Sequence, residues 1–170
     1  MRVFTLIELA IVIVIAAILA AVAIPIYQGI VDDSKWSEGK TAIGTIKNAV
    51  DVYLASNNDF AQLLTDAGVA VADKTAVAVN TLEQNLGMGS DSLASLQYFL
   101  ATDFTIAVDK AAGAPVYHIV VTCTGTGDQP STQGYGTRGV HKTGTTVTWY
   151  KAATTAATGT ELLPATYVTW

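Results

Sequence analysis

The chain has 170 residues, which is long enough for one modest globular domain plus an additional element but too short for two full domains. Its 9 lysines and arginines against 14 aspartates and glutamates give a net charge of -5, and no basic run appears. This balance argues against nucleic-acid binding, because neutralising phosphates requires a basic surface. Cys123 is the single cysteine, so the sequence holds neither an internal disulfide nor a CxxC metal or redox motif.

The N-terminal stretch from Phe4 to Tyr27 is predominantly apolar, over about the ~20 residues that a membrane-spanning helix requires. Glu8 is the only charged residue between Arg2 and Asp32. A carboxylate inside such a helix costs roughly 2.5 to 3.5 kcal/mol on insertion scales and therefore indicates function. We expect its cation to come from another copy of the chain or from this chain's own amino terminus. A carboxylate reaching the headgroups at the membrane edge is the simpler alternative.

A secretory signal peptide is a second interpretation of this stretch, and Ala20 to Ala23 resembles a cleavage site. Helix-compatible sequence nevertheless continues beyond Pro25 to Leu54, where a signal peptide would give way to a loop. Arg2 precedes the apolar run and two aspartates follow it, so the positive-inside tendency places the N-terminus in the cytoplasm.

The residues Phe4 to Leu9, with the run that closes at Ala20 to Pro25, resemble the N-terminal signature of bacterial type IV pilins and type II secretion pseudopilins. The resemblance implies cleavage by a prepilin peptidase before Phe4 and N-methylation of Phe4. It also implies that Phe4, Thr5 and Glu8 pair subunits, with Glu8 meeting the N-terminal ammonium of a neighbouring copy. Val3 stands where the family has glycine, which leaves the mature N-terminus open.

We expect one long helix over residues 1–56, with an apolar half at 4–27 and an amphipathic stalk at 28–56. Pro25 weakens the turn before it, because proline lacks a backbone donor. The stalk carries an apolar stripe at helical spacing, formed by Ile43, Ile46, Val50 and Tyr53, which predicts packing on the protein's own core. Trp36 and Glu38 are candidates for lateral contacts between subunits.

Residues 57–170 are expected to form a globular head, beginning with a short helix over Phe60 to Ala67 that ends at Gly68. Period-two alternation then predicts strands over Phe104–Val108, Tyr117–Cys123 and Val147–Tyr150, with a further edge strand at Tyr167–Trp170. Gly125 to Gly139 is expected to be a loop. The fold class is therefore α+β: a helix whose apolar half protrudes, packed on an antiparallel sheet of three to four strands, as in pilins.

No set of catalytic residues emerges, so we do not expect an enzyme or a cofactor. The two histidines are expected at structural or exposed positions, His118 on the outer face of a strand and His141 in a loop. Asp128 and Gln129 offer too few oxygen ligands to predict a calcium site.

The function that these features favour is a structural subunit of a type IV pilus-like filament. Such a subunit would wait in the inner membrane, interact with the prepilin peptidase and the pilus assembly machinery, and then assemble with identical copies into a cell-surface fibre. Two alternatives stay open: a pseudopilin of a secretion or DNA-uptake machine, and a solitary bitopic protein with an extracytoplasmic binding domain.

Overall fold

The computed structural model describes residues 5–57, 60–69, 76–89, 92–109, 116–123, 128–130, 136–152 and 167–170. Its longest element is the helix α1 (Leu6–Asn57), which runs without a break through Pro25. The chain divides into two compact units, Met1–Ser34 and Lys35–Trp170, so α1 contributes to both. Each unit is described by itself below.

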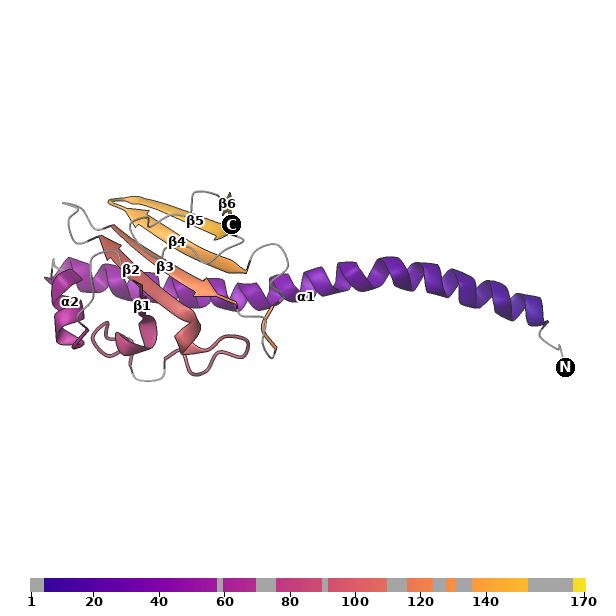
Figure 1. Cartoon of the computed structure of the whole chain (residues 1–170), viewed down its shortest axis with the longest axis horizontal. Coiled ribbons are helices and arrows are strands. Elements are labelled where there is room, and N and C mark those ends of the chain that lie inside the picture. The colour runs from indigo at the N-terminus through magenta and orange to yellow at the C-terminus, as the bar shows by residue number, and fades with distance from the viewer. Residues whose placement is uncertain are drawn as a thin grey trace. The chain divides into compact units, whose positions relative to one another are not determined.

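The second unit is built on a six-stranded antiparallel sheet in which each strand pairs with the next along the chain (Figure 1). Its strands, in chain order, are β1 (Val77–Ala78), β2 (Phe104–Asp109), β3 (Val116–Thr122), β4 (Thr137–Thr143), β5 (Thr146–Ala152) and β6 (Val168–Thr169). Short 3-10 helices at Val79–Thr81 and Ala101–Asp103 precede β2. The expected α+β architecture, a long helix packed on an antiparallel sheet, is confirmed.

One face of the sheet packs against the C-terminal half of α1 and forms the core. The predicted stripe of Ile43, Ile46, Val50 and Tyr53 is buried, with exposed fractions of 0 to 9%. Alternate residues of β2 and β3 belong to the same cluster, among them Phe104, Ile106, Val108, Tyr117, Ile119 and Val121. The helical and strand periodicities therefore meet in one apolar layer, which is the arrangement that both patterns predict.

The short helix α2 (Phe60–Asp66) lies where the sequence predicts it and ends through glycine. Gly68 has a φ of +68°. Its N–H bonds to the carbonyl of Thr65, and the N–H of Val69 bonds to the carbonyl of Leu64. This pair of bonds is the Schellman ending, which requires a left-handed residue that glycine adopts without steric cost.

The expected strand number of three to four is wrong, because the described residues alone form a sheet of six strands. The largest omission is β4, whose first residues, Thr137 to Gly139, were expected in a loop. Its sequence TRGVHKT carries glycine and three basic or titratable side chains, so it lacks the apolar alternation that marks a strand. β1 and β6 have two residues each, too few for any period to show.

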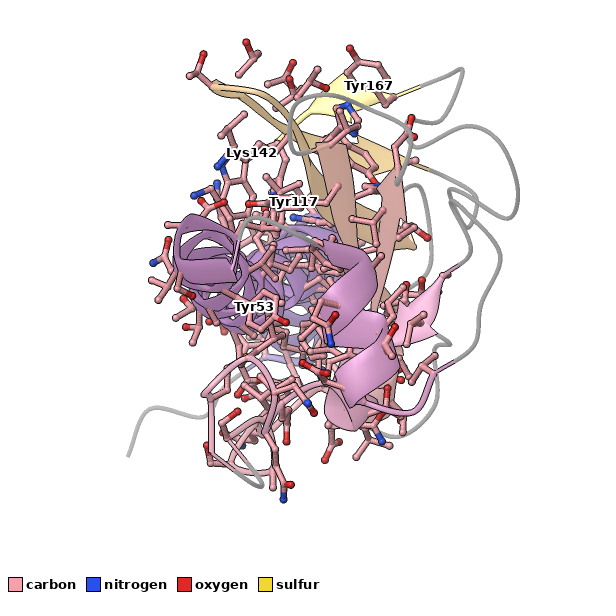
Figure 2. All side chains as sticks on the ribbon, turned by 90° about the vertical axis from the view of Figure 1, so that its left-hand side faces the viewer. Tyr53, Tyr117, Lys142 and Tyr167 are labelled. Carbon is pink, nitrogen blue, oxygen red and sulfur yellow. The ribbon has the colours of Figure 1, made fainter. Side chains whose placement is uncertain are left out.

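A polar cluster joins α1 to the sheet within the apolar layer. Asp51 Oδ1 accepts hydrogen bonds from the hydroxyl of Tyr117 and the ammonium of Lys142, both at 2.6 Å. Its Oδ2 lies 3.0 Å from Nζ of Lys47 one turn away. Figure 2 shows Tyr117 and Lys142 between the helix and the sheet. Burial, and then the bond to Asp51, raise the pKa of the Tyr117 phenol, so it remains a donor.

We expect Asp51→Asn to lower the free energy of unfolding by about 1–3 kcal/mol, because two partly buried ammonium groups lose their counter-charge. The measurement is denaturant unfolding of the full chain in detergent, followed by tryptophan fluorescence. Lys47→Ala is the matched control and should cost only about 0.3–0.5 kcal/mol, since it removes a single pair within the helix. Equal losses in the two variants would show that Asp51 does not join α1 to the sheet.

Gly139 allows Tyr150 of β5 to lie across β4. A methyl group at position 139 would stand 2.6 Å from the carbonyl oxygen of Ile119 and 2.7 Å from the hydroxyl of Tyr150. Gly139→Ala should therefore lower the free energy of unfolding by about 1–3 kcal/mol through overpacking. Gly44→Ala, where nothing lies within 4 Å, should instead be neutral or gain up to about 1 kcal/mol of helix stability. The same unfolding experiment compares the two, and a stable Gly139→Ala protein would contradict the packing.

Candidate assembly site

The first unit is an apolar helical segment. No described part of the chain covers its large side chains. From Leu6 to Ile30 the leucine, isoleucine, valine and tyrosine side chains are each more than half exposed, from 53% at Ile15 to 87% at Leu6. By length and composition alone, α1 could cross a membrane. So much contiguous apolar surface marks a site for lipid or for another protein.

Thr5 and Glu8 form a reciprocal cap at the start of α1. The backbone N–H and the hydroxyl of Thr5 both donate to Oε2 of Glu8, at 2.9 and 2.8 Å. In return the N–H of Glu8 approaches the hydroxyl oxygen of Thr5 at 3.3 Å. This is the capping box, in which a threonine and a glutamate three residues later satisfy backbone groups that the helix leaves without partners. The T-x-x-E spacing in the sequence carries the signature of this local role, which the expected pairing of Thr5 and Glu8 between subunits did not include.

The cap satisfies hydrogen bonds but leaves the charge of Glu8 uncompensated. Both of its bonds fall on Oε2, and no lysine, arginine or histidine among the described residues forms an ion pair with it. Among the described residues, no donor to Oε1 is found. Phe4, the expected source of a cation after cleavage, and Val3 lie outside the described residues.

Pro25 lies inside α1, and the helix continues on both sides of it. Proline has no N–H, so the carbonyl of Ala21 loses its usual intrahelical partner. Weakening of this turn stays a prediction.

Two of the residues expected to contact neighbouring subunits instead serve the second unit internally. Trp36 is 2% exposed, and its ring lies 5.3 Å from that of Phe99. Glu38 accepts the backbone N–H groups of Gln97 and Tyr98 at 2.7 and 2.8 Å, one on each oxygen. Their side chains therefore fasten the segment before β2 to α1.

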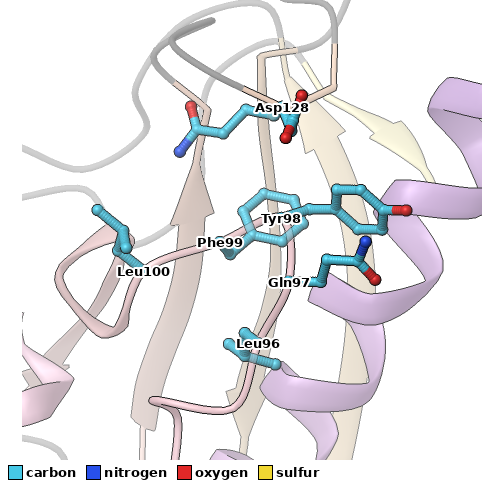
Figure 3. A pocket seen from close by; sticks show the side chains of 7 residues that line it. Leu96, Gln97, Tyr98, Phe99, Leu100 and Asp128 are labelled. Atoms are coloured by element: carbon cyan, nitrogen blue, oxygen red, sulfur yellow. The ribbon is translucent and has the colours of Figure 1, made fainter.

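An open hollow of about 300 Å³ lies beside that segment, lined by residues 96–100 together with Asp128 and Gln129 (Figure 3). The side-chain amide of Gln129 donates to Asp103 at 2.8 Å and is thus engaged within the protein. In the described ranges, no three histidine, cysteine or acidic side chains gather closely enough to hold a metal ion. The described residues that line the hollow therefore include no group that could hold a metal ion.

Curated relatives of this chain are fimbrial proteins. It is 43% identical over 76 residues to fimbrial protein EcpC of Eikenella corrodens, covering 45% of this chain and 43% of that protein. It is 39% and 38% identical over 93 residues to the fimbrial proteins of Neisseria meningitidis serogroups A and B, covering 54% of this chain and 55% of each. No family model and no solved structure matches. The chain spans about half the length of the relatives it matches, and over that part the resemblance to the type IV pilin family is confirmed.

The capping box predicts a local effect of Thr5. Thr5→Ala removes the two bonds of the hydroxyl but keeps the backbone N–H that also reaches Glu8, so the first helical turn should lose about 1 kcal/mol. Amide hydrogen exchange of the full chain in detergent should show the N–H of Glu8 exchanging about five times faster. Thr5→Ser keeps the oxygen and should retain wild-type protection. Unchanged exchange in Thr5→Ala would mean that the cap does not hold the turn.

Proposed function

We propose that this chain is a structural subunit of a type IV pilus-like filament, assembled from identical copies through the apolar first half of α1. The observation that carries the proposal is Glu8, a hydrogen-bonded carboxylate within an exposed apolar helix, to which no described residue supplies a cation. Before assembly this half-helix would lie in the inner membrane, with its N-terminus in the cytoplasm. After assembly it would form the filament core, and the second unit would form the outer surface.

The cation for Glu8 is, in this proposal, the terminal ammonium of a neighbouring copy. Opposite charges attract far more strongly in an apolar medium than in water. The loss of hydration offsets much of that attraction, so the pair sets the register between copies more than it adds affinity. Affinity would come from close packing of the helices, since exchanging lipid for protein leaves little hydrophobic gain.

The proposal includes processing at Phe4. Cleavage by a prepilin peptidase before Phe4 creates the ammonium one residue before Thr5, and N-methylation would modify the same nitrogen. The capping box survives this cut, because the bond between Phe4 and Thr5 stays intact and the N–H of Thr5 remains an amide donor. Mass spectrometry of the mature N-terminus tests the cut and the methyl group together.

Two substitutions at Glu8 separate its charge from its hydrogen bonds. Glu8→Gln keeps an acceptor that fits the capping box but removes the charge, whereas Glu8→Ala removes both. If pairing with a neighbour sets the register, both variants should insert into the membrane normally and both should yield at least tenfold fewer ordered filaments. The measurement is electron microscopy of sheared surface material, with immunoblots of the membrane fraction as the insertion control.

Wild-type filaments from Glu8→Gln would exclude the charge as the assembly determinant, and wild-type filaments from both variants would remove Glu8 from the mechanism. Long wild-type filaments of this polypeptide support the pilus subunit. Short or absent ones support a pseudopilin, and a monodisperse detergent monomer supports a solitary membrane protein.

A further inference from the structure

The face of the sheet that points away from α1 carries buried polar side chains on three neighbouring strands. Tyr117 and Ile119 belong to the core that α1 covers, so alternation places His118, between them, on the opposite face. His118 is 0% exposed, and neither of its ring nitrogens has a hydrogen-bond partner in the described structure. Nδ1 of His141 in β4 and the hydroxyl of Tyr150 in β5 are likewise buried without partners there. Buried polar groups are paired in the great majority of cases, so these exceptions require an explanation.

The backbone register brings the two histidines side by side. His118 and His141 are directly opposed in the β3–β4 ladder, and their ring centroids lie 6.2 Å apart. The ring of Tyr150 lies 5.2 Å from that of His118. A proton added to His118 would therefore create a cation that is buried from solvent and bonded to no acceptor, which is a costly state.

The acidic groups of the sheet do not neutralise the pair. Among the described strands the one carboxylate is Asp109, two residues beyond Ala107, which is directly opposed to His118. Asp109 shares the face of the two histidines, but it bonds neither ring nitrogen of His118 and not Nδ1 of His141. Nε2 of His141 lies 2.8 Å from the uncharged hydroxyl of Thr143. The imidazole nitrogens therefore have no bonded counter-charge in the described structure.

The cations of β4 and β5 lie on the other face of the sheet. Lys142 and Arg138 both contact side chains of α1. Lys151 is directly opposed to Arg138 in the β4–β5 ladder and so shares its face. Beside the histidines stand Tyr150 and Tyr167, whose rings are 6.0 Å apart and whose hydroxyls stay uncharged at and below neutral pH. In the described part of this face, only the two histidines change charge in mildly acidic solution.

We propose that His118 and His141 form an acid-sensitive latch between β3 and β4, and that protonation of the two rings loosens the second unit. As neutral rings they pack against each other across the ladder. Once protonated, they would place two cations at directly opposed positions, an arrangement that destabilises a strand pair. β3 and β4 are the two central strands of the sheet, so their separation would disrupt the whole second unit. This inference does not depend on the proposed filament.

The direction of the pH effect follows from where each state takes up its protons. Burial, and then the neighbouring His141, lower the pKa of His118 to about 3, and burial lowers the pKa of His141. In the unfolded chain a histidine has a pKa of about 6.5. Below that pH the unfolded chain binds more protons than the folded one. The stability that the neutral rings contribute is therefore complete above about pH 6.5 and is lost as the pH falls.

The test is denaturant unfolding of the full chain in detergent, followed by tryptophan fluorescence, between about pH 6.5 and pH 5. Carboxylates titrate mostly below this window, and the chain has no histidine besides these two. We expect the ratio of unfolded to folded chains to rise at least about tenfold across the window. His118→Leu should lose most of this rise, and the double variant His118→Leu/His141→Leu should lose all of it. Asp109→Asn keeps both histidines and is the matched control, which should retain the wild-type rise.

Histidine NMR of the wild-type chain gives an answer even if His118→Leu does not fold. The chain labelled with ¹³C at histidine Cε1 yields two signals, and His141→Leu, at the more exposed position, assigns the one that remains to His118. The His118 signal should keep the shift of a neutral ring down to about pH 5. A His118 signal that titrates near pH 6.5 would overturn the proposal. So would a wild-type ratio that stays constant across the window, or an unchanged rise in the double variant.

Discussion

The behaviour of the N-terminal unit depends on the difference between satisfying a carboxylate's hydrogen bonds and compensating its charge. Thr5 gives Glu8 two donors at 2.8 and 2.9 Å, which fixes the side chain at the start of α1. Neither donor is a cation. The carboxylate of Glu8 is therefore held in one orientation, and what it lacks among the described residues is a counter-charge. In an apolar surrounding, only a positive group from outside the described residues meets that need.

Asp51, near the C-terminal end of α1, shows the contrasting arrangement. Asp51 has two lysines and a tyrosine around it, all from its own chain, and it joins the helix to β3 and β4. One helix thus carries one carboxylate that completes the fold of the second unit and another that the fold leaves incomplete. Asp51 is thus neutralised by lysines of its own chain, whereas no described residue supplies a cation to Glu8.

The elements whose apolar residues repeat at a regular period could be predicted from the sequence. The contacts that depend on how the strands pair in the sheet could not. The stripe from Ile43 to Tyr53 and the apolar alternation of β2 and β3 repeat with the periods of helix and strand, so the core was predictable. β4 was not, because its side chains serve particular contacts: Arg138 lies over Trp36, Lys142 bonds Asp51, and Gly139 makes room for Tyr150. His141 was expected in a loop for the same reason, because β4 was not recognised as a strand. Only register places it opposite His118, and register cannot be read from a strand that is not recognised.

In a subunit cleaved before Phe4, the new ammonium can pair with Glu8 of the same chain. This limits the free energy that pairing with a neighbour's Glu8 adds. If cleavage occurs before Phe4, each subunit holds one ammonium and one carboxylate close together at the start of its own helix. Exchanging the internal pair for one between neighbours leaves the number of pairs unchanged, so the exchange by itself contributes little. Its energetic bias comes from position: an ammonium beside its own helix N-terminus lies at the positive end of the helix dipole, an unfavourable place. Displacing it toward a neighbour's Glu8 requires that neighbour to stand at one axial offset, since Thr5 holds the carboxylate in place. In the proposed filament, the cap would therefore let a weak, exchangeable ion pair set the axial offset between copies, while helix packing would supply the affinity.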